Sequence, residues 1–543
     1  MGHEANVDLI RALEKQIEEG KGDLIKLKRD RNSLLNISTR VPPEILGHIF
    51  AWCLVAGVQK AEPLYQPRFN GLRKGSYNFL PVCHHWFEVA SRTPELWSSW
   101  GNNLQDWGKR HHRPGTGPLD LVLIESKRDP DVHFDESLRD AVKSRVMQDA
   151  IRQAHLVSYG DDGDTLISII SALTPDDEGG QNENIESISW RHHGYRYYPI
   201  DVSDFFARSR LSKLRLLEIT GNFRISSWDG LASRTTSLIS LSLEMGGHSD
   251  PPSPILPASR LLSILTSNPN LQELSLHNIA LPDDTDTSTL KVPLRNLKSL
   301  VLTGDFRRLL GLLRQLILPG TLDTVYLVGS DPTVEEVSQI LGPYMRDYFR
   351  RNTRFQDELI VSSGFYEDSV SISVQVLCTQ TTTPTPRVSL MAELTDPPRS
   401  IVEQLFVNLV EPIPREHIVS FYYDLEAELP DEFFLMMPNI EALRLCGGEL
   451  SEGFLQPNPD GPHANTKLLP SLRSLCLENV SFLDEDWDYL VVYLAHQTSD
   501  GQAISLEVVG EFRPTRPGLM DEIKGLVEEF IHHNGTGSED AEE

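Results

Sequence analysis

The sequence has few cysteines, and their arrangement suggests neither a cross-link nor a metal site. Five cysteines are spread over 543 residues, at positions 53, 83, 378, 446 and 476, and no two form a CxxC pair. An odd number of widely separated cysteines argues against both a disulfide framework and a zinc site. We therefore expect a reducing compartment, either the cytoplasm or the nucleus.

The sequence also lacks long apolar runs and an excess of positive charge. It contains no run of 18 apolar residues, and its N-terminus has no apolar core of the kind found in signal peptides. Its 50 basic residues stand against 78 acidic ones, which gives a formal net charge of -28. Because phosphate backbones and anionic lipids attract positive charge, we expect a protein that binds no nucleic acid and no membrane.

Motifs of enzyme chemistry are missing as well. The sequence has no HExxH, no G-x-S-x-G, no P-loop and no G-x-G-x-x-G after an apolar strand. We expect neither a cofactor, a metal nor catalytic activity. A hydrolase on an irregular α/β sheet stays open as an alternative, but it would require a nucleophile and a base to converge in a pocket.

What the sequence does have is enough apolar residues, 39% of the total, to build a sizeable core. Near the N-terminus, apolar residues recur with a spacing of three and four, which predicts one helical stripe; the stripe comprises Ile10, Leu13, Ile17, Leu24, Leu27 and Leu34. We expect residues 1–36 to form an amphipathic helix that packs on its own domain. A short coiled coil with a partner helix is the alternative.

Two further helices are expected in residues 37–100. The segment Val41-Pro42-Pro43-Glu44 precedes apolar positions 45, 46, 49 and 50. Proline is tolerated in the first turn of a helix, and a glutamate there complements the helix dipole. A polar stretch from about Gln59 to Ser76 predicts a loop, and an amphipathic helix follows from Phe79 to Ala90.

Beyond residue 184 a short apolar pattern, L-x-x-L-x-L, recurs along the chain. Its first members lie from 22 (Ile418 to Ile440) to 33 (Leu238 to Leu271) residues apart. The pattern comprises Ile185, Ile188, Trp190; Leu214, Leu217, Ile219; Leu238, Leu241, Leu243; Leu271, Leu274, Leu276; Leu297, Leu300, Leu302; Leu322, Val325, Leu327; Ile418, Phe421, Tyr423; Ile440, Leu443, Leu445; Leu472, Leu475, Leu477; and a last strand with Ile504, Leu506 and Val508. Such recurrence is typical of stacked repeats, because one repeat alone cannot bury its apolar face.

The pattern predicts the fold class: an α/β protein, α+β overall, with an N-terminal helical module followed by an irregular α/β solenoid. Leucine-rich spacers such as 261–265, 306–317 and 487–494 are expected to return as helices. An ordinary open α/β sheet is the alternative. We assign residues 101–184 to a connecting region with the first strand and helix of the array, 185–330 and 418–533 to repeats, and 534–543 to an acidic disordered tail.

Residues 331–417 interrupt the repeats. Val370, Ile372, Val374 and Val376 alternate with polar residues, and 387–394 show a similar pattern, which predicts a hairpin or a bulge among irregular repeats. The sequence Gln380-Thr-Thr-Thr-Pro-Thr-Pro386 predicts a flexible loop. The register of this region does not follow from the sequence.

The motifs of residues 37–100 carry a family resemblance. A Pro-Pro-Glu-Ile-Leu-x-x-Ile-Phe helix start, a Leu-x-Val-Cys-x-x-Trp helix and a Thr-Pro-Glu-Leu-Trp exit ending at Trp97 resemble the F-box-like domain, especially its fungal version with a preceding heptad-type helix. The repeats behind it are similar to the leucine-rich regions common in that family. The resemblance implies a substrate-recognition adaptor of a Skp/cullin/F-box ubiquitin ligase, with no catalytic role of its own.

By this resemblance, the module binds the Skp adaptor and, through it, the cullin and RING subunits, while the repeats bind a protein target that the sequence does not identify. The adaptor-binding positions that it implies are Pro42, Pro43, Glu44, Ile45, Leu46, Ile49, Phe50, Leu80, Val82, Cys83 and Trp86. Among them, Pro42, Ile45 and Ile49 are the better candidates for direct contact, whereas Trp86 is expected to pack in the core of the module.

A second hypothesis belongs to another class of protein: a scaffold or regulatory binding protein that retains the F-box-like fold outside a ligase. Two observations motivate it. Val41 stands where the family usually has leucine, and the connection from Phe50 to Val82 is longer than usual because of a polar insertion. Binding to the Skp adaptor distinguishes the two hypotheses.

Overall fold

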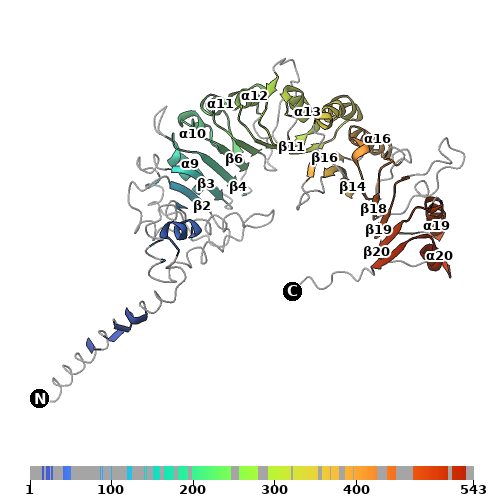
Figure 1. Cartoon of the computed structure of the whole chain (residues 1–543). Helices are drawn as coiled ribbons and strands as arrows, with labels where there is room; N and C mark the ends of the chain where they lie inside the picture. Colours follow the sequence, from blue (N-terminus) through green and yellow to red (C-terminus); the bar gives the residue numbers. More distant parts are fainter. Residues whose placement is uncertain are drawn as a thin grey trace. The chain divides into compact units, whose positions relative to one another are not determined.

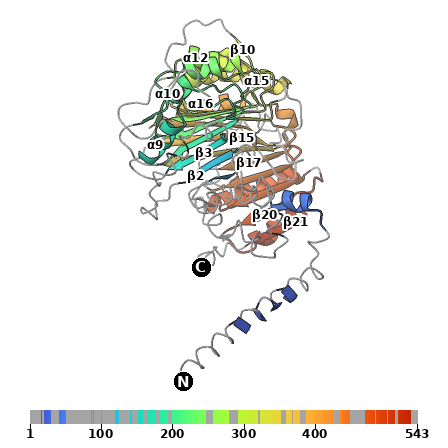
Figure 2. The same cartoon turned by 90° about the vertical axis from the view of Figure 1, so that its left-hand side faces the viewer.

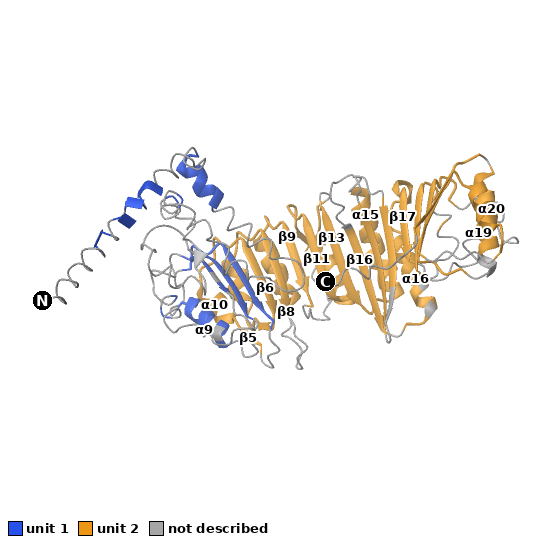
Figure 3. Ribbon diagram, turned by 90° about the horizontal axis from the view of Figure 1, so that it is seen from below, with its two compact units in different colours: residues 1–193 blue, residues 194–543 orange. Residues whose placement is uncertain are grey.

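The computed structural model divides the chain into two compact units, residues 1–193 and 194–543 (Figure 3). The structure describes residues 15–16, 20–21, 23–24, 26–28, 41–50, 86, 89, 99–100, 119–124, 140, 142, 151–158, 164–175, 182–193, 199–245, 256–278, 291–319, 322–351, 358–366, 369–377, 386–395, 397–424, 434, 437–447, 469–482, 484–499, 501–510 and 516–533. Residues 380–385 of the predicted flexible loop and the predicted tail at 534–543 lie outside these ranges, whereas Pro386, the last residue of that loop, is the first residue of a strand.

The first unit contains helical segments and a parallel sheet. Residues 43–50 are helical, and β1 (Ser99–Trp100), β2 (Leu119–Ile124), β3 (Ile151–Ser158) and β4 (Ser187–His192) pair in this order, all parallel. Helix α9 (Asp164–Leu173) connects β3 to β4. Parallel pairing thus begins well before Ile185, where the recurring pattern starts in the sequence.

The N-terminal helical residues described between positions 15 and 28 are all exposed. Leu24 and Leu27 of the predicted stripe are 52% and 66% exposed. The expected packing of the stripe on its own domain is therefore not seen at these two positions, whereas the other four leucines and isoleucines of the stripe lie outside the described residues.

The second unit is a mixed α/β unit dominated by one large, mostly parallel sheet. The strands of this unit are β5 (Ile200–Asp201), β6 (Leu216–Gly221), β7 (Phe223–Arg224), β8 (Ser240–Met245), β9 (Glu273–His277), β10 (Val292–Pro293), β11 (Ser299–Asp305), β12 (Leu316–Ile317), β13 (Thr324–Ser330), β14 (Glu358–Tyr366), β15 (Ser369–Leu377), β16 (Pro386–Thr395), β17 (Ser420–Asp424), β18 (Ala442–Cys446), β19 (Ser474–Glu478), β20 (Ser505–Val509) and β21 (Glu529–His533). Of these, β5 with β7 and β10 with β12 form two separate two-stranded sheets. Its helices are α10 (Ser203–Arg208), α11 (Asp229–Arg234), α12 (Ala258–Ser267), α13 (Phe306–Gln315), α14 (Val334–Glu336), the π-helical turn η2 (Val337–Leu341), α15 (Gly342–Arg351), α16 (Arg399–Val410), the 3-10 turn η3 (Arg415–His417), α19 (Asp484–Thr498) and α20 (Leu519–Leu526).

The apolar residues of the recurring pattern form the core on one side of this sheet. Every one of them is at most 3% exposed, in both units. In the second unit, Leu217, Leu241, Leu274, Leu300 and Val325 lie opposite one another on successive parallel strands. The predicted spacer helices are present as α12, α13 and α19, and helices line one face of the strands (Figures 1 and 2). The parallel-rich, solenoid-like α/β architecture predicted from the sequence is therefore observed.

Strands β14, β15 and β16 form an antiparallel meander inside the otherwise parallel sheet. Strand β13 pairs with β16, β16 with β15, β15 with β14, and β14 with β17, so the spatial order of the three inserted strands is the reverse of their order in the chain. The predicted hairpin is β15 with β16, and its register shifts between Val376 and Leu377. The meander resolves the register that the sequence left open.

Hydrogen bonds from loop to loop tie successive repeats together. The Gln272 carbonyl accepts the N–H groups of both Lys298 and Ser299, at 2.7 and 3.0 Å, and the carbonyls of Ile239 and Glu441 act in the same way toward the repeats that follow them. The buried side chain of Asn268 accepts from the Leu238 N–H and donates to the carbonyls of Thr235 and Ile264. These bonds satisfy backbone groups that the ends of helices and strands would otherwise leave unpaired.

Candidate functional site

The helix at residues 43–50 begins where the sequence predicts it. The N–H group of Leu46 donates to the carbonyl of Pro42 at 3.0 Å, which closes the first turn. Pro43 occupies the first helical position, where its missing N–H costs nothing because no partner is available there. The sequence thus fixes the start of the helix, and with it the directions of the side chains that follow.

This helix has apolar residues on two faces. Leu46 and Phe50 are 3% and 2% exposed and form the inner face. Ile45 and Ile49, one turn apart on another face, are 51% and 46% exposed, and Pro42 is exposed beside them. We call Pro42, Ile45 and Ile49 the outer stripe of the helix; Pro43 and Glu44 are exposed as well.

An aromatic contact connects the inner face to the second predicted helix. Trp86 is helical and half-buried, and its ring centroid lies 5.1 Å from that of Phe50 with the planes tilted by 56°. Such a pair stabilises the packing of two helices by about 0.5–1.5 kcal/mol beyond its buried area. Leu80, Val82, Cys83 and Trp97, which the resemblance also implies, lie outside the described residues.

The second unit presents a polar strand surface on β17 to β20. On each of these strands alternate residues are buried, and those between them are partly or fully exposed. Nε and Nη2 of Arg444 donate to Oε2 of Glu478 at 2.9 and 2.7 Å, and the guanidinium lies 5.8 Å from the centroid of the Tyr422 ring. The hydrogen bond with Glu478 raises the pKa of Arg444 above its ordinary value. We call Tyr422, Arg444, Cys446, Cys476 and Glu478 the strand-surface cluster.

The two thiols of this cluster are poor nucleophiles. Burial, followed by the nearby Glu507 carboxylate, raises the pKa of Cys476 to about 11. Burial likewise raises the pKa of Cys446 above its ordinary value, as it does for the hydroxyl of Tyr422. Because the thiolate is the reactive form of cysteine, a raised pKa lowers the share of reactive thiolate at both positions near neutral pH.

A hydroxyl and an imidazole meet on strands β9 and β11. Oγ of Ser275 lies 2.7 Å from Nε2 of His277, and Oγ1 of Thr303 lies 3.2 Å from Nδ1 of the same ring. In the Ser-His-Asp triad of hydrolases a carboxylate orients the histidine base, and a pocket beside the serine holds the substrate. Here a second hydroxyl occupies the orienting position, and none of these three residues lines the pocket described next.

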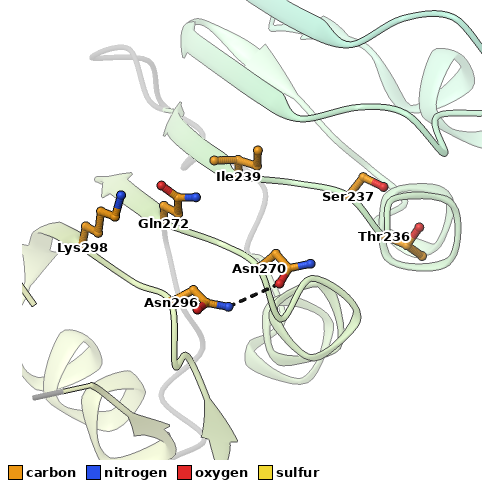
Figure 4. A pocket seen from close by; sticks show the side chains of 7 residues that line it. All are labelled: Thr236, Ser237, Ile239, Asn270, Gln272, Asn296 and Lys298. Carbon is orange, nitrogen blue, oxygen red and sulfur yellow. Dashed lines mark hydrogen bonds between the residues drawn. The ribbon is translucent and has the colours of Figure 1, made fainter. Parts of the chain in front are cut away.

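That pocket lies at the upstream ends of β8, β9 and β11 (Figure 4). It encloses about 430 Å³, and its lining comes from the positions that flank the first leucine of three successive repeats: Thr236, Ser237, Ile239, Asn270, Gln272, Asn296 and Lys298. Nδ2 of Asn296 donates to Oδ1 of Asn270 at 3.3 Å. Amides and hydroxyls dominate this lining, which holds no carboxylate, histidine or thiol for acid–base or nucleophilic chemistry.

Within the described ranges, no group of three or more histidine, cysteine, aspartate or glutamate side chains could hold a metal ion. None of the helices in those ranges combines the length and apolar character that crossing a bilayer requires.

The strand-surface cluster is the part of the candidate site that sequence reasoning missed. Tyr422, Arg444 and Cys476 stand between the last two apolar residues of the pattern in their repeats, and Cys446 and Glu478 directly follow the last one. Their outward direction therefore follows from the alternation of a strand. Their contacts with one another depend on the register between strands, which the sequence does not provide.

Comparisons with known proteins give little further guidance. No family model matches the chain, and no curated protein matches it in sequence. Among solved structures, the chain is similar to one in the crystal structure of the Rad7 and Elc1 complex in yeast, with 12% identity, 86% of this chain and 94% of that chain covered, and a TM-score of 0.28. A TM-score this low supports no argument about fold or function.

Proposed function

We propose that this protein is a substrate-recognition adaptor of a Skp/cullin/RING ubiquitin ligase. The helix at 43–50 binds the Skp adaptor, and the strand surface of the second unit binds the target protein. The observation that supports this best is that the helix has two apolar faces. Leu46 and Phe50 are buried, while the outer stripe of Pro42, Ile45 and Ile49 is exposed.

The exposed isoleucines give the helix a driving force for docking. Fully burying an isoleucine side chain stabilises by roughly 1.5–3 kcal/mol. Since Ile45 and Ile49 are about half exposed, covering what remains contributes roughly 1 kcal/mol each. Phe50 and Trp86 hold the inner face, so the helix need not reorganise to bind.

The chain itself is non-catalytic in this proposal. The raised pKa values of Cys446 and Cys476 lower the share of thiolate that could attack a ubiquitin thioester. The contribution of the receptor is to raise the effective concentration of the target near the charged conjugating enzyme, while the transfer takes place on other subunits. Polar groups such as Tyr422, Arg444 and Glu478 suit the selective recognition of a protein surface.

A charge in the outer stripe tests the proposal. The double variant Ile45→Asp/Ile49→Asp should lose co-purification with the Skp adaptor, because docking would bury two unpaired carboxylates. We expect binding to weaken by at least about 3 kcal/mol, which is more than about 100-fold in Kd. Val492→Asp is the matched control, since Val492 is also a branched apolar residue, 55% exposed, but belongs to another helix, α19.

Circular dichroism of both variants checks that the repeats remain folded. Equal retention of binding by the double variant and by Val492→Asp would contradict the assignment of the outer stripe. A wild-type chain that binds its target but no Skp adaptor would favour the scaffold hypothesis instead. Affinity purification with mass spectrometry, with and without proteasome inhibition, reports both partners in one experiment.

A further inference from the structure

The helical residues near the N-terminus present an open apolar face. Leu24 and Leu27 are helical, and their side chains are 52% and 66% exposed. Gly20 lies one turn before Leu24, so the three positions share one face of the helix. A Cβ placed on Gly20 would meet nothing within 4 Å, which shows that this face has room for further side chains. We call Gly20, Leu24 and Leu27 the seam of this helix.

The seam is part of a heptad pattern. In a heptad labelled a to g, Leu24 falls at position a, while Gly20 and Leu27 fall at position d. The alternating spacing of three and four continues in the sequence on both sides: Ile10, Leu13, Ile17, Arg31 and Leu34. A repeat of seven residues keeps one face of a helix turned toward a second helix along its whole length. The spacing therefore suits another helix as the partner of the seam.

The charges beside the seam favour a second copy of the same helix. Asp23 falls at position g and Lys28 at position e; both are exposed, and neither forms an ion pair with another described residue. In a parallel pair of helices, position g of one helix faces the next position e of the other. Asp23 of each copy would thus face Lys28 of the other copy. In an antiparallel pair, g faces g and e faces e, which sets like charges against each other.

We propose that residues 20–28 pair with the same residues of a second copy of this chain as a parallel, in-register coiled coil. The contact is isologous, so it closes on itself and yields a dimer. This surface is separate from the outer stripe and does not depend on the proposed function. Because Gly20 leaves one d position without an apolar side chain and weakens the helix, we expect a weak dimer whose population rises with protein concentration.

Cysteine cross-linking of the full-length chain tests the contact and its direction. Leu24→Cys and Leu27→Cys should each form a cross-linked dimer on mild oxidation, because equivalent seam positions of a parallel, in-register pair lie opposite each other. An antiparallel pair can bring at most one of these positions opposite its own copy. Lys26→Cys is the matched control, since Lys26 is exposed on the same helix but falls at position c, away from the partner.

The native cysteines are present in all three variants, so their background is matched. Equal cross-linking of Lys26→Cys and Leu27→Cys would overturn the proposal. Cross-linking by only one of the two seam variants would refute the parallel register, and cross-linking by neither would refute the contact.

Exchanging the charges tests the pairing of Asp23 with Lys28. Asp23→Lys alone and Lys28→Asp alone each set like charges against each other on both sides of the seam, so each should raise the Kd of the dimer by roughly threefold to tenfold. A mixture of the two variants should dimerise as tightly as the wild type, because the mixed pair has opposite charges on both sides. A mixture that dimerises no more tightly than either variant alone would contradict the pairing.

Analytical ultracentrifugation of the full-length chain over a dilution series measures the dimer without any cross-link. Gly20→Leu should tighten it by at least about tenfold, since leucine fills the seam and favours the helix in both copies. Leu27→Asp should abolish it, and circular dichroism checks that the rest of the chain remains folded. A wild-type chain that stays monomeric over the whole series would refute the proposal, as would equal dimerisation by the wild type and Leu27→Asp.

Discussion

A substitution of one side chain, Asn268, tests how hydrogen bonds between successive repeats stabilise the array. It is 1% exposed and stands at the end of α12, where it connects one repeat to the preceding one. Its Oδ1 accepts from the Leu238 N–H at 2.9 Å, and its Nδ2 donates to the Thr235 carbonyl at 3.1 Å and to the Ile264 carbonyl at 2.8 Å. Replacing Asn268 by alanine removes these three contacts, together with the longer one from Nδ2 to Oγ1 of Thr235 at 3.5 Å, and leaves no polar group on the side chain that could replace them.

The expected loss of stability follows from the buried backbone groups that lose their hydrogen-bond partner. A buried backbone group left without a partner costs about 1–3 kcal/mol, and water entering the space recovers part of that cost. For the Leu238 N–H together with two carbonyls, we expect Asn268→Ala to lower the free energy of unfolding by about 3–5 kcal/mol. Asn268→Asp should be at least as damaging, because it retains the acceptor but turns an oxygen toward the carbonyls of Thr235 and Ile264.

Urea denaturation followed by circular dichroism measures the effect, and hydrogen exchange of peptides around Leu238 localises it to the repeat. Asn270→Ala is the matched control, two residues away in the same loop but exposed, where we expect a cost within about 0.5 kcal/mol. If Asn268→Ala cost less than about 1 kcal/mol, or no more than Asn270→Ala, the role given to this bridge would be refuted.

Two further predictions concern packing and reactivity. A Cβ at Gly230 would lie 2.5 Å from the backbone oxygen of Phe206, so Gly230→Ala should lower the free energy of unfolding, measured by urea denaturation, by about 1–3 kcal/mol. Gly525 has a helical backbone and nothing within 4 Å of a Cβ placed there, so Gly525→Ala should raise that free energy by up to about 0.5–1 kcal/mol. Equal effects of the two substitutions would contradict the close approach of α10 and α11. Alkylation of Cys476 in the folded protein should be slow at neutral pH and accelerate as the pH rises toward about 11, because the raised pKa keeps the thiol protonated below that pH. Mass spectrometry measures the labelling, and rapid labelling at neutral pH would contradict the burial of this thiol.

The core of the repeats could be predicted from the sequence because it depends on periodicity alone. Leu241 and Leu243 are separated by one residue, so they lie on the same side of a strand, and the recurrence of the pattern indicates that neighbouring strands share this side. Both are fully buried. Residues 101–184 were assigned the first strand and helix of the array without bounds; the structure has β2, β3 and α9 in this range, and the apolar run of β2 lacks the spaced pattern that would have located it.

The order of strands could not be predicted in the same way. Alternation identifies Val374 and Leu390 as facing one side, but it does not distinguish a strand that pairs with its predecessor in the chain from one that pairs two positions away. The reversed order of β14, β15 and β16 depends on contacts between β13 and β16 and between β14 and β17, which are distant in sequence. The strand-surface cluster depends on register in the same manner.

The helix at 43–50 could be predicted from the sequence only in part. Its start and its two faces follow from Pro43 and from the spacing of apolar residues. What the outer face binds does not follow from them, because an exposed apolar stripe fits any apolar groove of similar shape.

Direct binding of the purified full-length chain to an immobilised Skp adaptor is the measurement that tests the central claim. The account predicts saturable binding by the wild type that Ile45→Asp/Ile49→Asp abolishes and Val492→Asp preserves. Absence of binding by the wild type, at concentrations where a standard F-box protein saturates the same surface, would contradict it.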